Sequence, residues 1–429
     1  MTRLFVAASP AGLLAMTAAL DAGLLAGRGR RILLLAGAAP VPGQAPALGD
    51  VPGFAALARR YDEVIDLAAE IAPLHPAGWS PPAEELPLFA RLLRRAWGLG
   101  GGPVELVTES VARHPGRALS LIFHDAPLTV CTPDLTAYGP TMEPLPPGVG
   151  GRIRALVHLD LVPGLAPLLL AEYGIDVEVI AEDAWRGVAA ELSPPVLPPE
   201  TAVILGPPED ARCLDMVRGA VGSGHSSVVF VPCDGIGPGT APGSARRLAE
   251  EAARLGARLV VAEQADPPDL WFAGKEPPAL VAGASGGPLL RAARLFGLPV
   301  ACAEAGRLLD RLPRYEHPDR VPLTLLDAAL PELTSTGEMV PPPAVELRTL
   351  IPAIAYCMRA TVHAGLRRET EAYLTEIADG PLTRYFSRTR LDELRLLMPP
   401  PEDRPPPSEP SPRPSGGRLG ARLRRRPTG

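Results

Sequence analysis

The sequence is poor in the residues from which disulfide frameworks and zinc sites are built. Its 429 residues include five cysteines, which are odd in number, scattered along the chain and free of any C-x-x-C spacing. This pattern argues against a disulfide framework and against a zinc site. We therefore expect no bound metal, and we expect the cysteines to be small buried side chains in a reducing compartment.

The sequence also lacks an uninterrupted apolar run of the roughly 20 residues that a membrane-spanning helix needs. The most apolar stretch near the start, residues 4–25, is broken by Pro10, Gly12 and Asp21 and is followed by arginines. A secretory signal has the reverse order of charge, with basic residues before the apolar stretch. We therefore expect a cytoplasmic protein.

Lysine is almost absent. Lys275 is the only lysine among 42 basic residues, whereas the chain contains 54 prolines and 43 glycines. We interpret this usage as coding bias, so proline is a weaker turn signal here than usual. A net charge of −6 neither implies nor excludes an anionic partner. We expect no nucleic-acid partner.

The length favours two domains, and 46% hydrophobic residues indicate a globular chain. In the first half, short apolar segments alternate with helical ones, which predicts a parallel sheet covered on both faces. The expected strands are residues 3–8, 31–35, 63–67, 105–107, 119–123, 128–130 and 176–180. The expected helices are residues 13–25, 54–60, 89–97 and 161–173.

A second series follows a proline-rich joint at residues 193–199. Its expected strands are 202–205, 227–231, 258–262, 279–282 and 300–303. Its expected helices are 209–222, 243–255 and 288–295, and residues 344–397 turn helical. The fold class is therefore α/β, with two Rossmann-like doubly wound domains (residues 1–192 and 193–397) facing a cleft. In such sheets ligands bind at the carboxyl ends of the strands.

Residues 398–429 are rich in proline, serine and arginine and cannot bury a core, so we expect a disordered tail. The tail ends in a cluster of arginines. A solvated basic tail is the first interpretation. The alternative is adhesion to anionic lipid or polymer, a peripheral membrane contact.

Several short stretches, in order between about residues 3 and 360, point to one known family. In the first half they are Pro73-Leu74-His75-Pro76 with Trp79, Glu109-Ser110, Tyr138-Gly139-Pro140-Thr141, Arg152-Ile153 and the run from Leu159 to Leu165. In the second half they are Leu205-Gly206, Gly224-His225, Val228-Val229-Phe230 and Arg320-Val321-Pro322. Together these stretches resemble the bacterial, especially actinobacterial, alpha-2,8-polysialyltransferase family.

The resemblance implies a GT-B-like arrangement of the two domains, with the acceptor bound by the first and the nucleotide by the second. It implies transfer of sialic acid from CMP-sialic acid, or a related sugar nucleotide, to a hydroxyl of a glycan acceptor, with no cofactor. The acceptor hydroxyl needs a general base, and the departing phosphate needs hydrogen-bond or cationic support.

The family's base lies in an acidic-acidic-glycine motif just before the Tyr-Gly-Pro-Thr segment. The matching residues here are Thr132, Pro133 and Asp134, so proline stands at the base position and the carboxylate comes one residue late. Asp134 is the candidate catalytic residue. The competing interpretation is an aspartate that caps a turn after proline.

Two nucleotide-binding motifs are also altered. Where the family has His-Pro, this sequence has Cys233-Asp234, and a neutral thiol cannot offer the charge of an imidazolium. Where the family has two hydroxyl residues opening a helix, it has Ser285-Gly286-Gly287. That turn can still bind an anion through backbone N–H groups, or it is an ordinary helix cap.

Gly206 and His225 complete the candidate nucleotide site, since both lie in stretches that resemble the family, and we expect His225 to border the cleft. Three hypotheses follow, of which the third, a different GT-B member such as a sugar-nucleotide epimerase, is disfavoured by the stretches quoted above. The chain is a transferase whose base has moved, with Asp134 as the candidate. Alternatively it is a catalytically inactive homologue that binds a glycan or nucleotide as partner of an active paralogue.

Overall fold

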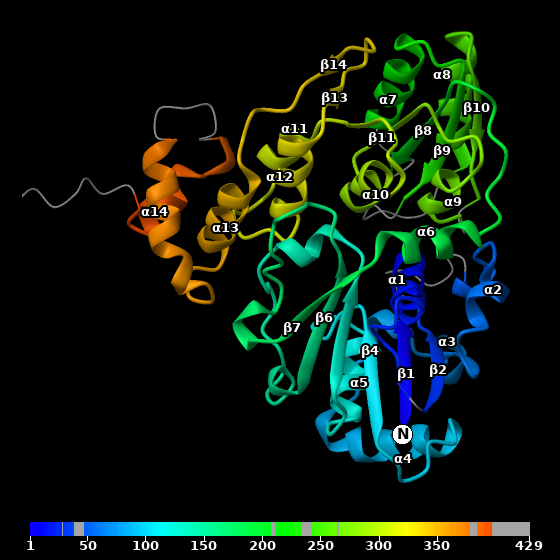
Figure 1. Ribbon diagram of the computed structural model, residues 1–429, viewed down its shortest axis with the longest axis vertical. Coiled ribbons are helices and arrows are strands. Elements are labelled where there is room, and N and C mark those ends of the chain that lie inside the picture. The colour runs from blue at the N-terminus through cyan, green and yellow to red at the C-terminus, as the bar shows by residue number, and fades with distance from the viewer. Residues whose placement is uncertain are drawn as a thin grey trace, which may run out of the picture.

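The computed structural model describes residues 1–27, 29–37, 47–206, 211–233, 242–263, 266–377 and 384–396. They form two α/β units, each built on a seven-stranded sheet (Figure 1). The predicted fold class, two Rossmann-like doubly wound domains, is confirmed by this topology. The tail expected at 398–429 lies outside the described residues.

The first sheet has the strand order β3-β2-β1-β4-β5-β6-β7, and all its strands are parallel. Its strands are β1 Thr2–Ala7, β2 Arg30–Leu35, β3 Glu63–Asp66, β4 Val104–Thr108, β5 Leu128–Thr132, β6 Ile153–Leu159 and β7 Asp176–Ile180. The α-helices of this half are α1 Pro10–Asp21, α2 Phe54–Ala58, α3 Leu67–Glu70, α4 Leu86–Ala96, α5 Gly116–Ile122 and α6 Glu182–Ala190.

The second sheet repeats this winding in the order β10-β9-β8-β11-β12-β13-β14, with only β14 antiparallel to its neighbour among the described strands. Its strands are β8 Thr201–Gly206, β9 Ser227–Pro232, β10 Arg258–Val261, β11 Leu280–Gly283, β12 Val300–Cys302, β13 Glu332–Leu333 and β14 Met339–Val340. The α-helices are α7 Ala211–Gly222, α8 Pro242–Arg254, α9 Pro268–Phe272, α10 Gly286–Phe296, α11 Ala305–Asp310, α12 Arg320–Ala329, α13 Leu347–Met358, α14 Arg367–Glu376 and α15 Arg388–Glu393.

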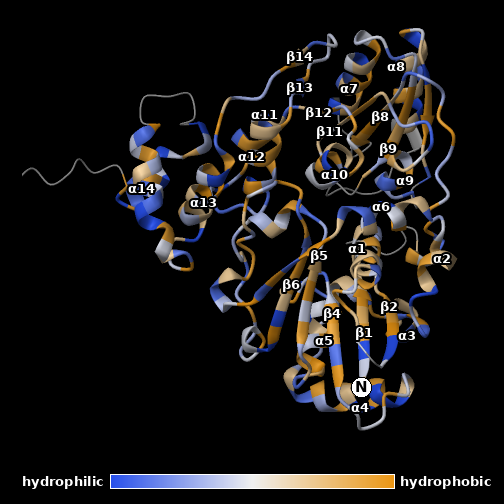
Figure 2. Cartoon of the chain, in the orientation of Figure 1, coloured by the Kyte–Doolittle hydropathy of each residue, from blue (hydrophilic) through white to orange (hydrophobic). Residues whose placement is uncertain are grey.

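Hydrophobic residues concentrate in the strands of both sheets (Figure 2). Every residue of β8 is buried, and so are five of the six residues of β1. A parallel strand covered by helices on both faces reads as a continuous apolar run. That is why the central strands of both halves could be recognised in the sequence.

Two segments of the first half form another element than expected, and β6 and α6 have no counterpart among the expected strands and helices. Residues 119–123, expected as a strand, form the end of helix α5 and its C-cap, and the buried residues of α5 include Leu119 and Ile122. A short apolar run cannot by itself distinguish a strand from the inward face of a helix. Residues 161–173, expected as a helix, form a loop containing Pro163, Gly164 and Pro167 and ending in a short 3-10 turn, Ala171–Tyr173.

The chain passes from the first domain to the second through α6, which Figure 1 shows between the two sheets. The C-terminal helices then contact the first domain again. Arg359, which follows α13, donates from Nη1 to the carbonyl oxygen of Met142 (3.0 Å). The two domains are thus joined both by the linker helix and by α13. None of the described helices is long and apolar enough to cross a bilayer.

Gly53 of the first domain packs closely against the end of α6. Its φ is +76°, and a Cβ at this position would collide with the carbonyl oxygen of Glu191. We expect Gly53→Ala to destabilise the protein by about 2 kcal/mol or more, because a left-handed backbone and a collision act together. Gly23→Ala is the matched control, since Gly23 has a φ of +79° and open space around it. Equal losses in a urea titration would show that the contact with α6 contributes nothing.

Candidate functional site

The carboxyl edges of the two sheets face one another across the domain interface (Figure 1). In each sheet the strand order reverses beside the first strand of the domain, between β1 and β4 and between β8 and β11. Ligands of open α/β sheets bind at such points, outside the carboxyl ends of the strands. The candidate site is therefore made of the described residues at the carboxyl ends of these strands and of their neighbours in each sheet.

At the first of these points, a partly buried carboxylate meets the start of a helix. Glu109 follows β4, and Ser9 follows β1 and caps α1. Oε1 of Glu109 accepts hydrogen bonds from the backbone N–H groups of Ala8 (2.6 Å) and Ser9 (2.9 Å), and Oε2 accepts from the hydroxyl of Ser9 (2.7 Å). Burial raises the pKa of Glu109 to about 7. The hydrogen bonds from Ser9 and Ala8 oppose the rise, and the charge of Asp134 adds to it.

Asp134, the predicted catalytic residue, follows β5 and lies against the second domain. It immediately precedes the 3-10 turn η4 (Leu135–Tyr138), and a side chain on Gly287 would collide with its Oδ1. A Cβ on Gly286 would lie 2.7 Å from Cδ1 of Leu135. Asp134 and Leu135 thus occupy the space in front of the first turn of α10, where the sequence predicted a phosphate.

A buried polar cluster lies behind this contact. Arg291 of α10 donates from Nε and Nη2 to the carboxylate of Asp269 (2.9–3.2 Å), and Nε1 of Trp185 donates to the same carboxylate (3.0 Å). Arg291 is 1% exposed and Asp269 is 0% exposed. Nη1 of Arg291 also reaches Oδ1 of Asp134 (3.4 Å). One guanidinium therefore links α9 and α10 to the linker helix α6 and to the first domain.

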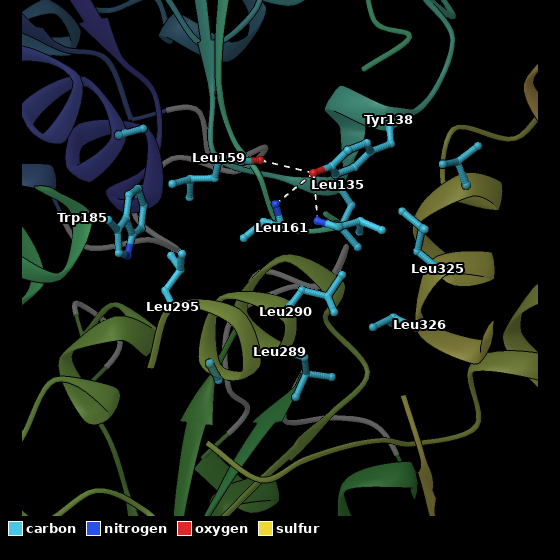
Figure 3. Close-up of a cluster of buried hydrophobic side chains, with 14 of the residues drawn as sticks. Leu135, Tyr138, Leu159, Leu161, Trp185, Leu289, Leu290, Leu295, Leu325 and Leu326 are labelled. Atoms are coloured by element: carbon cyan, nitrogen blue, oxygen red, sulfur yellow. Dashed lines mark hydrogen bonds between the residues drawn. The ribbon is translucent and has the colours of Figure 1, made fainter. Parts of the chain in front are cut away.

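An apolar part of the interface lies beside this cluster. Buried leucines of both domains pack together here around α10 and α12 (Figure 3). The hydroxyl of Tyr138 accepts hydrogen bonds from the backbone N–H groups of Leu161 (2.9 Å) and Val162 (3.0 Å). Two stretches quoted for the family resemblance, 138–141 and 159–165, therefore meet in space, and their contact shapes the loop after β6.

Three predicted nucleotide-binding positions come together at the carboxyl edge of the second sheet. Gly206 ends β8, and its carbonyl oxygen accepts from the backbone N–H of Cys233 (3.2 Å), which follows β9. Ser285 is the N-cap residue of α10, without a hydrogen bond from its side chain to the helix. Burial lowers the pKa of Arg291, but Asp269, Asp134 and Cys233 together raise it above its ordinary value. Asp234 lies outside the described residues.

His225 does not join this group. It precedes β9, at the amino edge of the sheet, where its Nδ1 lies 3.0 Å from the carbonyl oxygen of Glu200, the residue before β8. The expectation that His225 borders the cleft is therefore corrected. A parallel strand separates its two ends by its full length, and the glycine turn before β9 lies at the end remote from the ligand edge.

Sequence reasoning did not assign a role to Glu109 or to Arg291. A signal for Glu109 existed, since a carboxylate directly after the fourth strand of a doubly wound sheet lies beside the residue that follows the first strand. No local signal marked Arg291, because its partners Asp269 and Asp134 are 22 and 157 residues away in the chain.

The described part of the chain contains no cluster of three or more His, Cys, Asp or Glu side chains that could hold a metal ion. All five cysteines are among the described residues, and none of them forms a disulfide.

No protein-family model matches the chain, and no curated protein matches its sequence. Among solved structures, UDP-GlcNAc 2-epimerase from Neisseria meningitidis bound to UDP-GlcNAc is 10% identical, with a TM-score of 0.43, and the match covers 92% of this chain and 99% of that one. Phytolacca americana UGT2, in complex with UDP-2fluoro-glucose and pterostilbene, is 12% identical, with a TM-score of 0.40 and coverage of 92% and 98%. Anabaena Alr3699/HepE, in complex with UDP and glucose, is 13% identical, with a TM-score of 0.37 and coverage of 92% and 99%.

Proposed function

We propose that this protein is a glycosyltransferase of the GT-B kind that binds a sugar nucleotide on its second domain and transfers the sugar to an acceptor held by the first. The observation that carries the proposal is that the two points where strand order reverses, one in each sheet, lie opposite one another across the domain interface. Glu109 and Ser9 on one side, and Gly206 with Ser285 on the other, lie on sheet edges that face one another.

The donor phosphate binds at the first turn of α10 in this proposal. The helix has 11 residues, and its free backbone N–H groups and dipole favour an anion there. Gly286 and Gly287 have no side chains that would keep a phosphate away from those N–H groups. Since Asp134 and Leu135 cover this turn, the donor enters when η4 withdraws from α10.

CMP-sialic acid is the donor we propose first, because the ordered stretches of the sequence resemble the polysialyltransferase family. A glycan hydroxyl is the corresponding acceptor. The experiment is to incubate the purified protein with CMP-sialic acid, a UDP-sugar or an ADP-sugar, and to measure free nucleotide with and without acceptor glycans. Acceptor-dependent release of CMP supports the full proposal. Release of UDP or ADP supports the transferase but shows that the donor is another sugar nucleotide. If no donor releases its nucleotide, the proposed transferase function is contradicted.

A non-catalytic role is the second candidate, favoured by the contact between Asp134 and Arg291. In that case the closed interface is the working state, and the protein acts as a glycan- or nucleotide-binding partner. Calorimetric titration separates the candidates, since a non-catalytic partner binds nucleotide or glycan without releasing product.

Ser285 offers a direct test of the phosphate position. Aspartate is as good an N-cap residue as serine, so Ser285→Asp preserves α10 while placing a negative charge beside the proposed phosphate. We expect the Kd of the sugar nucleotide to rise about tenfold or more, because like charges in contact are strongly unfavourable. Ser285→Asn, neutral and of the same size as aspartate, is the control. Equal Kd values for the two variants would place the phosphate elsewhere.

A further inference from the structure

We propose that Glu109, rather than Asp134, is the general base that takes the proton from the acceptor hydroxyl. The inference rests on the proposed transferase function and assigns its central chemical step.

The position of Glu109 is that of a ligand-facing residue. β4 and β1 are adjacent parallel strands in register, so the residues that follow them lie side by side at the carboxyl edge. The strand order of the first sheet reverses between these two strands. An acceptor bound at this switch point lies next to the carboxylate of Glu109.

The carboxylate is held in a fixed orientation. Oε1 accepts two backbone hydrogen bonds, whereas Oε2 accepts one, from the hydroxyl of Ser9, among the described residues. A carboxylate oxygen has two lone pairs, so Oε2 keeps one that can accept a hydrogen bond from an acceptor hydroxyl. Gly12 preserves this arrangement, since any side chain there would collide with the carboxylate.

Capping of α1 alone does not explain this carboxylate. Ser9 already caps the helix, because its Oγ accepts from the backbone N–H of Gly12 (3.0 Å). Burial nevertheless raises the pKa of Glu109 to about 7, which makes its ionised form unfavourable. A base whose pKa lies near the working pH is well suited to proton transfer. Strongly shifted pKa values are found most often at functional sites.

Asp134 is less suited to the role. Its Oδ1 contacts the guanidinium of Arg291 and faces the first turn of α10 in the other domain. One oxygen of this carboxylate is therefore engaged by the second domain. Its charge instead acts on Glu109, since it contributes to the raised pKa.

The acceptor oxygen forms a bond to the anomeric carbon of the donor sugar, and its proton moves to Oε2 of Glu109. The bond between the anomeric carbon and the phosphate oxygen breaks, and its electron pair leaves with the nucleotide. Solvent then removes the proton from Glu109.

The test compares three variants by transfer rate and by calorimetry with the sugar nucleotide. We expect Glu109→Gln, which keeps the shape of the side chain, to lower kcat by about 10²- to 10⁴-fold and to leave the Kd of the donor nearly unchanged. Glu105→Gln, on the same strand and paired with Arg3, is the matched control and should keep the wild-type rate. Asp134→Asn should lose much less activity than Glu109→Gln.

The pH profile separates a base from a merely structural residue. The wild-type kcat/KM should rise with pH through an apparent pKa near 7. The kcat/KM of Glu109→Gln should show no such rise. Ser9→Ala removes a hydrogen bond that lowers the pKa of Glu109. In this variant the rise of kcat/KM should therefore occur at higher pH. Wild-type transfer that survives in Glu109→Gln would overturn the assignment and leave the transferase standing. Absence of transfer by the wild-type protein from every donor would overturn both.

Discussion

Replacing Asp269 with alanine is expected to lower the free energy of unfolding by about 3–5 kcal/mol, because it leaves a buried guanidinium without its main partner. Asp269 accepts three hydrogen bonds from Arg291 and one from Trp185, and neither charged side chain of the pair is exposed by more than 1%. A chemical denaturation series measures the loss. Because Trp185 belongs to α6, the loss should extend to the link between the domains.

The control is an ion pair at the surface. Asp215 and Arg218 form a pair on α7 in which both side chains are more than 40% exposed. Asp215→Ala should leave the denaturation midpoint unchanged within error, since exposed pairs contribute little. A double variant, Asp269→Leu with Arg291→Met, should recover part of the stability lost by Asp269→Ala, because apolar residues of similar volume often replace a buried pair without loss. A midpoint for Asp269→Ala equal to that of the wild type would show that Arg291 is satisfied by other groups.

Replacing Glu109 with glutamine is expected to stabilise the protein above pH 7 by about 1–3 kcal/mol. The ordinary pKa of the side chain is 4.5, and in the folded protein it is about 7. Between these values the folded state binds more protons than the unfolded state, so stability falls as pH rises and the loss is complete above pH 7. Below pH 4.5 the carboxyl is protonated in both states, and the advantage of glutamine should disappear.

Denaturation midpoints of the two proteins between pH 4 and pH 8 check this prediction. Glu105→Gln should show no comparable gain at high pH, since Glu105 forms an ion pair with Arg3. A difference between wild type and Glu109→Gln that stays constant with pH would mean that the pKa of Glu109 is not raised. A gain in stability together with a loss of transfer is the expected behaviour of a residue kept for function.

Much of the candidate site could be predicted because the ends of parallel strands can be read from apolar runs. The expected strands at 202–205, 227–231 and 279–282 coincide closely with β8, β9 and β11. The residues that follow them therefore had to lie at one edge. The same reasoning failed for His225, which stands before a strand, and for residues 119–123, whose apolar side chains form the inner face of α5.

The sequence by itself determined the α/β class, the two doubly wound halves and the helix turn at Ser285, because hydrophobic periodicity and the alternation of strands with helices can be read along the chain. Only the tertiary structure decided what the carboxylates do. It placed Asp134 against Arg291 and α10, and Glu109 against Ser9 and the start of α1. These pairings join residues 100 or more positions apart, and the pKa of a carboxyl depends on its burial and on charges brought near it by packing. Neither the burial of a carboxyl nor the charges near it can be read from residue type or spacing.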